Sequence, residues 1–241
     1  DLGVIEENNS KNHKYKYDIK VIPTGIKHGT LTFVLDHVHV EITTYRCESE
    51  YENNRRPKDV TFTRSLKEDV QRRDFTINAL ALNEDGLQDF YGGLEDIQKK
   101  VIRAVGDPDL RFNEDALRIM RCLRFAFQLN FDIEENTRCA MLECKHLLSK
   151  ISKERIAVEI NKFLCGKNVK NALLYNWEII SEIIPEIAKM HGFDQKNRHH
   201  IYDILTHTAV AIENTLPITH LRLAALFHDT GKIYTVSTDE N

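Results

Sequence analysis

The sequence predicts an α+β protein in which a β-rich head precedes a chain that is helical almost to its end. Residues 30–35 (TLTFVL) and 38–45 (VHVEITTY) are β-rich runs joined by Asp36-His37, which suits a hairpin turn. From residue 111 onward, apolar side chains recur instead at helical spacing. We therefore expect three parts: a partial head over residues 1–95, a helical segment over 96–170 and a helical body over 171–241.

The composition is that of a globular protein without a general nucleic-acid-binding charge. The chain has 241 residues, 41% of them hydrophobic, and a formal net charge of −4. This charge does not exclude a local basic groove. No apolar run is long enough to span a membrane, no signal-peptide pattern is present, and the five cysteines form no CxxC pair. The sequence therefore predicts a cytoplasmic protein with reduced thiols.

The head begins with polar residues up to about residue 19, which we expect to form a loop, and residues 24–29 (TGIKHG) predict a turn-rich loop. In the second β-run, Val38, Val40 and Ile42 point to one face, so Glu41 lies on the opposite, polar face. Glu41 is either an ordinary solvent-facing carboxylate or a metal-binding carboxylate on the sheet.

A capping box, Ser65-Leu66-Lys67-Glu68, predicts the start of a helix that continues to Ala79. On that helix, Asp74 and Asn78 lie one turn apart on the same face. A carboxylate beside an amide suits a ribose hydroxyl, although the pair would equally pin the helix to a neighbouring loop. Arg73 suits a triphosphate, because hydrogen bonds between charged groups are strong. Further on, Gly92-Gly93 predicts a tight turn or hinge in preference to a phosphate loop.

The segment around which the chain is organised is 111–127 (RFNEDALRIMRCLRFAF), which follows Asp107-Pro108 and predicts one helix. Its apolar stripe comprises Ala116, Ile119, Met120, Leu123 and Phe127. The opposite side carries Glu114, Arg118 and Arg121, with Asp115 and Arg124 at the flanks. Two interpretations stay open. One is a surface with Asp115–Arg118 and Glu114–Arg118 ion pairs. The other is a nucleotide-binding face, since arginine donates to phosphates and base edges.

The remaining sequence predicts further helices, one of them introduced by Ser152-Lys153-Glu154-Arg155. The last third of the chain is rich in histidine. His228-Asp229 places a nitrogen and an oxygen ligand at the end of an apolar helix, and His207 is a third candidate ligand. These donors suit a divalent transition metal, although most isolated histidines are structural.

Taken together, these segments resemble the bacterial-type CCA-adding enzymes (tRNA nucleotidyltransferases) and the related poly(A) polymerases. Over residues 20–241 the segments that carry the resemblance, in the family's order, are GIKHGT, VEITTYR, NRRP, RRDFTINAL, DFYGG, RFNEDALRIMRCLRFA and ISKERIAVEI. HIYDILTHT and AALFHDTGK are similar to the HD domain fused to many members. The resemblance implies a polymerase-β-like head, an all-helical neck and the start of a helical HD domain.

The same resemblance implies that CMP and AMP, from CTP and ATP, are added to the tRNA acceptor end without a nucleic-acid template. It places Asp74 and Asn78 at the ribose, Arg73 at the triphosphate, and Asp115 with Arg118 at the Watson–Crick edge of the base. Arg121 and Arg124 match further nucleotide contacts, Glu154 and Arg155 a motif that steadies the neck, and Glu41 a catalytic carboxylate. The implied cofactors are Mg²⁺ in the head and a divalent transition metal at His207, His228 and Asp229.

The sequence departs from the family pattern at both ends. The glycine-rich GGxxRD segment and the DxD aspartates that would bind Mg²⁺ are not recognisable, and the HD region ends before its last expected acid. Asp18 is the only acid near the expected position. We therefore expect a chain truncated at both ends, with little nucleotide transfer on its own. The alternative functions are poly(A) addition, RNA or nucleotide binding without catalysis, and metal-dependent phosphate hydrolysis by the HD region.

Overall fold

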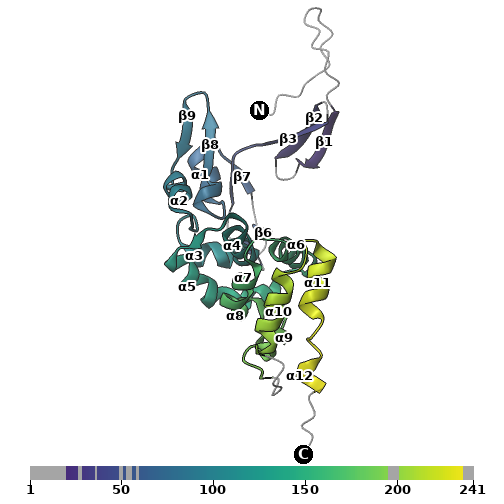
Figure 1. Cartoon of the computed structure of the whole chain (residues 1–241). Coiled ribbons are helices and arrows are strands. Elements are labelled where there is room, and N and C mark those ends of the chain that lie inside the picture. The colour runs from purple at the N-terminus through teal and green to yellow at the C-terminus, as the bar shows by residue number, and fades with distance from the viewer. Residues whose placement is uncertain are drawn as a thin grey trace, which may run out of the picture. The chain divides into compact units, whose positions relative to one another are not determined.

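The contacts within the chain divide it after Tyr45 into two units, residues 1–45 and 46–241. The computed structural model describes residues 20–26, 29–35, 37–48, 51–52, 56–57, 60–194 and 201–235. Figure 1 shows the helices and strands of both units. The predicted boundaries at residues 95 and 170 do not coincide with this division.

The first unit contains a three-stranded antiparallel sheet in the order β1 (Lys20–Gly25), β2 (Thr30–Leu35), β3 (Val38–Thr43). β2 and β3 form the predicted hairpin, with Leu35 opposite Val38 and a left-handed φ of 68° at His37. The loop predicted over 24–29 is wrong at its start, because β1 extends to Gly25. Lys27, His28 and the loop predicted up to residue 19 lie outside the described residues.

Short antiparallel ladders open the second unit. β4 (Arg46–Glu48) pairs with β7 (Val60–Phe62), and β5 (Tyr51–Glu52) pairs with β6 (Arg56–Pro57). β8 (Leu80–Asn83) pairs with β9 (Gly86–Asp89).

The capping box starts α1 (Leu66–Gln71) as predicted, since the Ser65 side chain accepts a hydrogen bond from the Glu68 backbone N–H at 3.3 Å. The prediction that this helix continues to Ala79 is wrong. Backbone bonds from Thr76 N–H to Arg103 O and from Val105 N–H to Asp74 O replace helical bonds, and a 3-10 turn follows at Thr76–Asn78. This extended stretch buries Phe75 completely in the core.

Asp89 caps the next helix, α2 (Gly93–Lys99). Its carboxylate accepts hydrogen bonds from the backbone N–H groups of Gly93 and Leu94, both at 2.9 Å. Burial acts to raise the pKa of Asp89, but these backbone hydrogen bonds outweigh burial and hold the pKa below its usual value. Gly92 adopts a left-handed φ of 75° as the N-cap of α2, and Gly93 is the first residue of that helix, so the two glycines form a helix start where a tight turn or hinge was expected.

The organising segment forms two helices, so the prediction of one helix is wrong. α3 (Pro108–Glu114) begins three residues before the predicted start at Arg111, and α4 (Leu117–Leu129) follows after a break at Asp115. Asp115 has an extended backbone, with φ −144° and ψ 99°, and its carboxylate accepts a hydrogen bond from the Leu117 N–H at 3.2 Å. A side chain that caps the following helix thus interrupts a pattern that is otherwise helical.

The remaining elements complete the second unit, and some of them pack against α4. β10 (Val101–Ile102) and β11 (Asp132–Ile133) pair in parallel beside it. The helices that follow are α5 (Glu135–Cys144), α6 (Lys153–Leu164), α7 (Val169–Tyr175), α8 (Trp177–Ile180), α9 (Glu186–Met190), α10 (Ile204–Glu213), α11 (Thr219–Phe227) and α12 (Lys232–Thr235), with a 3-10 helix at Lys145–Lys150. Within the described ranges, no helix is long and apolar enough to cross a membrane.

One hydrophobic core spans the predicted boundaries at residues 95 and 170, so the chain does not divide into separate units there. Its fully buried side chains include Phe75 before the first predicted boundary, Ile119 and Phe163 between the two, and Leu226 after the second. Arg222 adds a polar tie, because its buried guanidinium donates to the Leu164 carbonyl oxygen at 2.7 Å and thereby joins α11 to the end of α6.

Candidate nucleotide-binding site

Two segments that are distant in the sequence meet at a cavity of about 470 Å³ in the second unit. One segment is 72–78, and the other comprises the break at Asp115 and the first turns of α4. The lining residues are Arg72, Arg73, Asp74, Asn78, Asp115, Arg118, Arg121 and Phe125. Six of the seven residues predicted to bind a nucleotide therefore share one cavity, and Arg124 is the exception.

Asp74 fixes the two segments to each other, and its side chain is almost fully buried (the residue is 7% exposed). Its Oδ1 accepts hydrogen bonds from the Asn78 amide at 3.0 Å and the Phe75 N–H at 2.9 Å. Its Oδ2 accepts a hydrogen bond from Arg121 Nε at 2.7 Å and forms an ion pair with the same guanidinium, with Nη2 at 2.6 Å. Asn78 thus stands beside Asp74 as expected, although on a 3-10 turn.

Arg73 extends from the same segment with 45% of its side chain exposed. Its Nη1 donates to the Asn78 carbonyl oxygen at 3.2 Å, and its Nη2 lies 3.7 Å from Asp69 Oδ2. These contacts hold the guanidinium at the cavity wall, where an anion can still reach it.

Asp115 and Arg118 have separate partners. The Arg155 guanidinium binds the Asp115 carboxylate twice, with Nη1–Oδ1 at 3.2 Å and Nη2–Oδ2 at 2.7 Å. Arg118 Nη1 pairs with Glu114 Oε2 at 2.7 Å. Of the two ion pairs expected on a simple surface face, Glu114–Arg118 is confirmed and Asp115–Arg118 is wrong.

Arg118 is nearly as buried as Asp74, and it is held from both segments. Besides its pair with Glu114, it donates to the carbonyl oxygens of Arg111 at 3.0 Å and Arg72 at 2.8 Å. A guanidinium carries five N–H donors. Three of them serve these described partners, so two remain for a ligand in the cavity.

Arg121 lines the cavity and is held there by its ion pair with Asp74. Arg124 does not line the cavity. Arg124 Nε donates to Glu159 at 2.6 Å, and its guanidinium lies 4.0 Å from the centre of the Phe125 ring. Arg124 therefore links α4 to α6, and its position does not support the predicted nucleotide contact.

Sequence reasoning missed Glu159, which is buried on α6. The available signal was its spacing, because Glu159 shares a helix face with the buried Ile156, Ile160 and Phe163, and a carboxylate among apolar neighbours needs a partner. Arg72 and Phe125 of the cavity wall were also missed. Of the predicted supporting pair on α6, Arg155 holds Asp115, while Glu154 is exposed.

The charge of the cavity suits an anionic ligand. Four arginines and two aspartates line it, an excess of two positive charges (4 − 2). Its volume falls in the range of roughly 300–1,000 Å³ typical of small-molecule sites. The walls thus offer cations for phosphates, an aromatic ring for a base, and a carboxylate with a guanidinium for a polar base edge.

Glu41, the predicted catalytic carboxylate, lies on β3 of the first unit, where it is exposed and opposite Thr32. Asp18 lies outside the described residues. Among the residues that are described, no group of three or more potential ligands includes Glu41. A single exposed carboxylate does not fit the Mg²⁺ that the resemblance implies, because that ion needs further oxygen ligands.

His207, His228 and Asp229 converge as predicted. The two Nε2 atoms are 3.2 Å apart, and Asp229 Oδ2 lies 3.5 Å from His207 Nε2 and 3.4 Å from His228 Nε2. Ligands about 2.0–2.1 Å from a tetrahedral zinc ion stand roughly 3.3 Å apart, so this triangle has the right size. The Ala225 carbonyl oxygen, 2.7 Å from His228 Nδ1, orients the ring. Lys232 Nζ also contacts Asp229, at 2.8 Å.

Comparison with known proteins accounts for most of these segments. Residues 5–103 match the family described as "Poly A polymerase head domain". Over these residues the chain is similar to a poly A polymerase head domain. Beyond that head domain, residues 130–190 match the family "Probable RNA and SrmB- binding site of polymerase A".

Relatives of this chain include CCA-adding enzymes. That of Anoxybacillus flavithermus is 49% identical over 171 residues, which are 70% of this chain and 43% of the relative. That of Limosilactobacillus fermentum is 56% identical over 156 residues, 64% of this chain and 39% of the relative. The crystal structure of the Bacillus stearothermophilus CCA-adding enzyme in complex with CTP is 41% identical, with a TM-score of 0.60, and the match covers 66% of this chain and 38% of that chain.

These comparisons confirm the resemblance and the predicted fold class, a nucleotidyltransferase head followed by a helical neck. The chain spans about two fifths of the length of the curated relatives it matches. The likeness of the last helices to an HD domain stays a prediction.

Proposed function

We propose that this chain selects and positions CTP and ATP for the addition of CMP and AMP to the tRNA 3′ end, as part of a CCA-adding nucleotidyltransferase. The main support is that residues 72–78 and 115–121, predicted separately from two motifs, line one positively charged cavity. A relative that holds CTP supports the choice of ligand. On this proposal residues 1–95 are the head, 96–170 the neck and 171–241 the helical body. The five unpaired thiols support a cytoplasmic setting.

Asp115 and Arg118 supply the chemistry of base selection. A carboxylate only accepts hydrogen bonds and a guanidinium only donates them. Cytosine and adenine each present an amino donor beside a ring acceptor, and uracil and guanine present the reverse order. Asp115 pairs with Arg155 and Arg118 pairs with Glu114, so the two groups are not bonded to each other. Asp115 accepts three hydrogen bonds and Arg118 donates three, which leaves about one acceptor site and two donors for the base.

Asp74 acts as a positioning residue on this proposal, although the resemblance places it at the ribose. A carboxylate has about four acceptor sites. Hydrogen bonds from Phe75, Asn78 and Arg121 Nε use three of these sites, and the Arg121 guanidinium also stands against Oδ2, with Nη2 at 2.6 Å. Asn78, held by Asp74, then bonds the ribose hydroxyl, and the half-exposed Arg73 binds the triphosphate.

Calorimetric titration of the chain with CTP, ATP, UTP and GTP tests this function. We expect CTP and ATP to bind and to compete for one site, with UTP and GTP at least about 10-fold weaker, the effect of roughly one mispaired hydrogen-bonding group. Binding of ATP without CTP would favour poly(A) addition, which shares these residues. Similar affinities for all four nucleotides would contradict the proposal.

We also propose a divalent transition metal at His207, His228 and Asp229, on the basis of the donor triangle described above. Elemental analysis of purified protein should find about one equivalent of metal in the wild type, as expected for one tetrahedral site. His228→Ala should lose it, and the control His220→Ala, at an exposed position on the same helix, should keep it. An equal metal content in both variants would contradict the site. Such a site would also be needed for phosphate hydrolysis by this region.

A further inference from the structure

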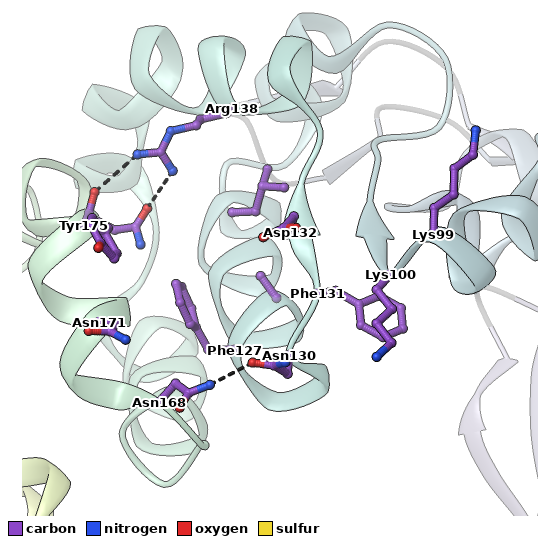
Figure 2. Close-up of a pocket in the computed structure, with 13 residues that line it drawn as sticks. Lys99, Lys100, Phe127, Asn130, Phe131, Asp132, Arg138, Asn168, Asn171 and Tyr175 are labelled. Atoms are coloured by element: carbon purple, nitrogen blue, oxygen red, sulfur yellow. Dashed lines mark hydrogen bonds between the residues drawn. The ribbon is translucent and has the colours of Figure 1, made fainter.

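A second cavity of about 720 Å³ lies in the same unit and has no role in the function proposed above. It borders the last turn of α4, at Phe127 and Asn130, whereas the nucleotide site borders the first turns. Figure 2 shows α7 on one side of it, with Asn171 and Tyr175, and Lys100 and Asp132 on the other. We call it the asparagine pocket, because four asparagines line it.

The polar groups of the asparagine pocket suit a nucleotide. Lys99, Lys100 and Arg138 outnumber the one acid, Asp132, which gives an excess of two positive charges (3 − 1). An asparagine amide offers both donors and acceptors, as a base edge does, so the exposed amide of Asn171 can bond to a base in either order, whereas Asn176 is buried and bonded to Arg138 and Ala172. Cations with neutral amides fit a phosphodiester chain better than they fit an apolar ligand.

An aromatic surface accompanies these polar groups. Tyr175 lines the pocket, and 71% of this large aromatic residue is exposed to solvent. Phe127 and Phe131 also line the pocket. Stacking of bases on exposed aromatic rings beside cations is the usual way in which proteins hold unpaired nucleotides.

The pocket is fixed in place by bonds that cross it. Asn168 Nδ2 donates to Asn130 Oδ1 at 2.7 Å, which joins the end of α4 to the start of α7. Arg138 makes two long bonds, to Asn176 Oδ1 at 3.4 Å and to the Tyr175 carbonyl oxygen at 3.3 Å (Figure 2). Three of the four non-glycine residues with positive φ in the described ranges, Lys100, Asn130 and Asn168, lie on its wall. The site is therefore preformed.

We propose that the asparagine pocket binds an unpaired nucleotide of the RNA substrate, with Tyr175 stacked on the base, amides at its edge and Lys100 at the phosphate. Nine of its 13 lining residues fall within residues 130–190, the segment that matches a probable RNA-binding family. The choice of RNA as ligand rests on the proposed function, but the pocket is separate from the CTP and ATP site.

Fluorescence anisotropy with a labelled tRNA that lacks its terminal CCA, and with a labelled single-stranded RNA, tests this pocket. Tyr175→Ala is expected to weaken RNA binding about 5-fold or more, the loss typical of one stacked base. Lys100→Asn, which removes the charge and tolerates the left-handed backbone, should also weaken it. The matched control is Tyr234→Ala, because that tyrosine is 63% exposed and lies outside the pocket.

CTP titration of the same variants separates the two proposals. Unchanged RNA affinity in both Tyr175→Ala and Lys100→Asn would overturn the pocket even if CTP and ATP bind selectively. An equal loss of CTP affinity would also overturn it, since the effect would then not be confined to RNA. Loss of RNA affinity in a chain that binds no nucleotide would support the pocket and contradict the proposed function.

Discussion

Replacing Asp74 by alanine is expected to lower the free energy of unfolding by about 3 kcal/mol and to abolish measurable CTP binding. The carboxylate is almost fully buried and carries the hydrogen bonds to Phe75, Asn78 and Arg121 that join residues 72–78 to α4. Its removal leaves the Arg121 guanidinium without its closest partner in a partly buried place. Breaking a buried ion pair usually costs about 3–5 kcal/mol of stability. The low end applies here, because the Arg121 side chain is one-third exposed.

Urea unfolding and CTP titration check this prediction, and a double-mutant cycle assigns its cause. If the loss comes from the orphaned cation, Asp74→Ala/Arg121→Met should recover about 1 kcal/mol or more relative to the sum of the single variants. Strict additivity of the two substitutions would show that the pair does not act as a unit.

Replacing Gly93 by alanine is expected to destabilise the protein by about 3 kcal/mol, at the upper end of overpacking effects, and to weaken nucleotide binding as well. A Cβ atom at Gly93 would lie 2.2 Å from the Thr76 carbonyl oxygen and 2.9 Å from its carbon, so α2 would have to move away. Thr76 is buried, hydrogen-bonded to Asp96 at 2.6 Å, and begins the turn that carries Asn78.

The neighbouring glycine provides a matched control. Gly92 has a φ of 75°, and a Cβ there would meet nothing within 4 Å. Gly92→Ala should therefore cost only the left-handed strain of about 1–2 kcal/mol and leave CTP binding intact. If urea unfolding finds Gly93→Ala no less stable than Gly92→Ala, the close approach of α2 to the turn does not limit stability.

The sequence was sufficient to find six of the eight residues that line the nucleotide cavity, but not their bonds. Helical spacing singled out Asp74, Asn78, Asp115 and Arg118 as candidates, and the family resemblance assigned the two segments to one nucleotide. The partner of Arg118 was ambiguous, because Glu114 and Asp115 are both within reach on a helix. Arg155, 40 residues further along the chain, binds Asp115 and so decides the pairing, and local spacing carries no information about it.

The helix predictions failed at two places for a related reason. Residues 72–79 have helical spacing, yet Phe75 is fully buried only when the chain is extended and paired with 103–105. The break at Asp115 likewise depends on a side chain that caps α4 and on a partner from α6. In both cases a contact distant in the sequence overrides a local preference, and both breaks lie at the candidate site.

The most direct test of the central claim, that protein side chains select the base, is the ratio of CTP to UTP affinity in the wild type and in Asp115→Asn. Asparagine keeps the size of the side chain and its capping oxygen but adds donors where the carboxylate only accepts. We expect a preference for CTP of at least about 10-fold in the wild type and a ratio near one in the variant. An unchanged ratio, or an equal loss of affinity for both nucleotides, would contradict the assignment of Asp115 as a selector.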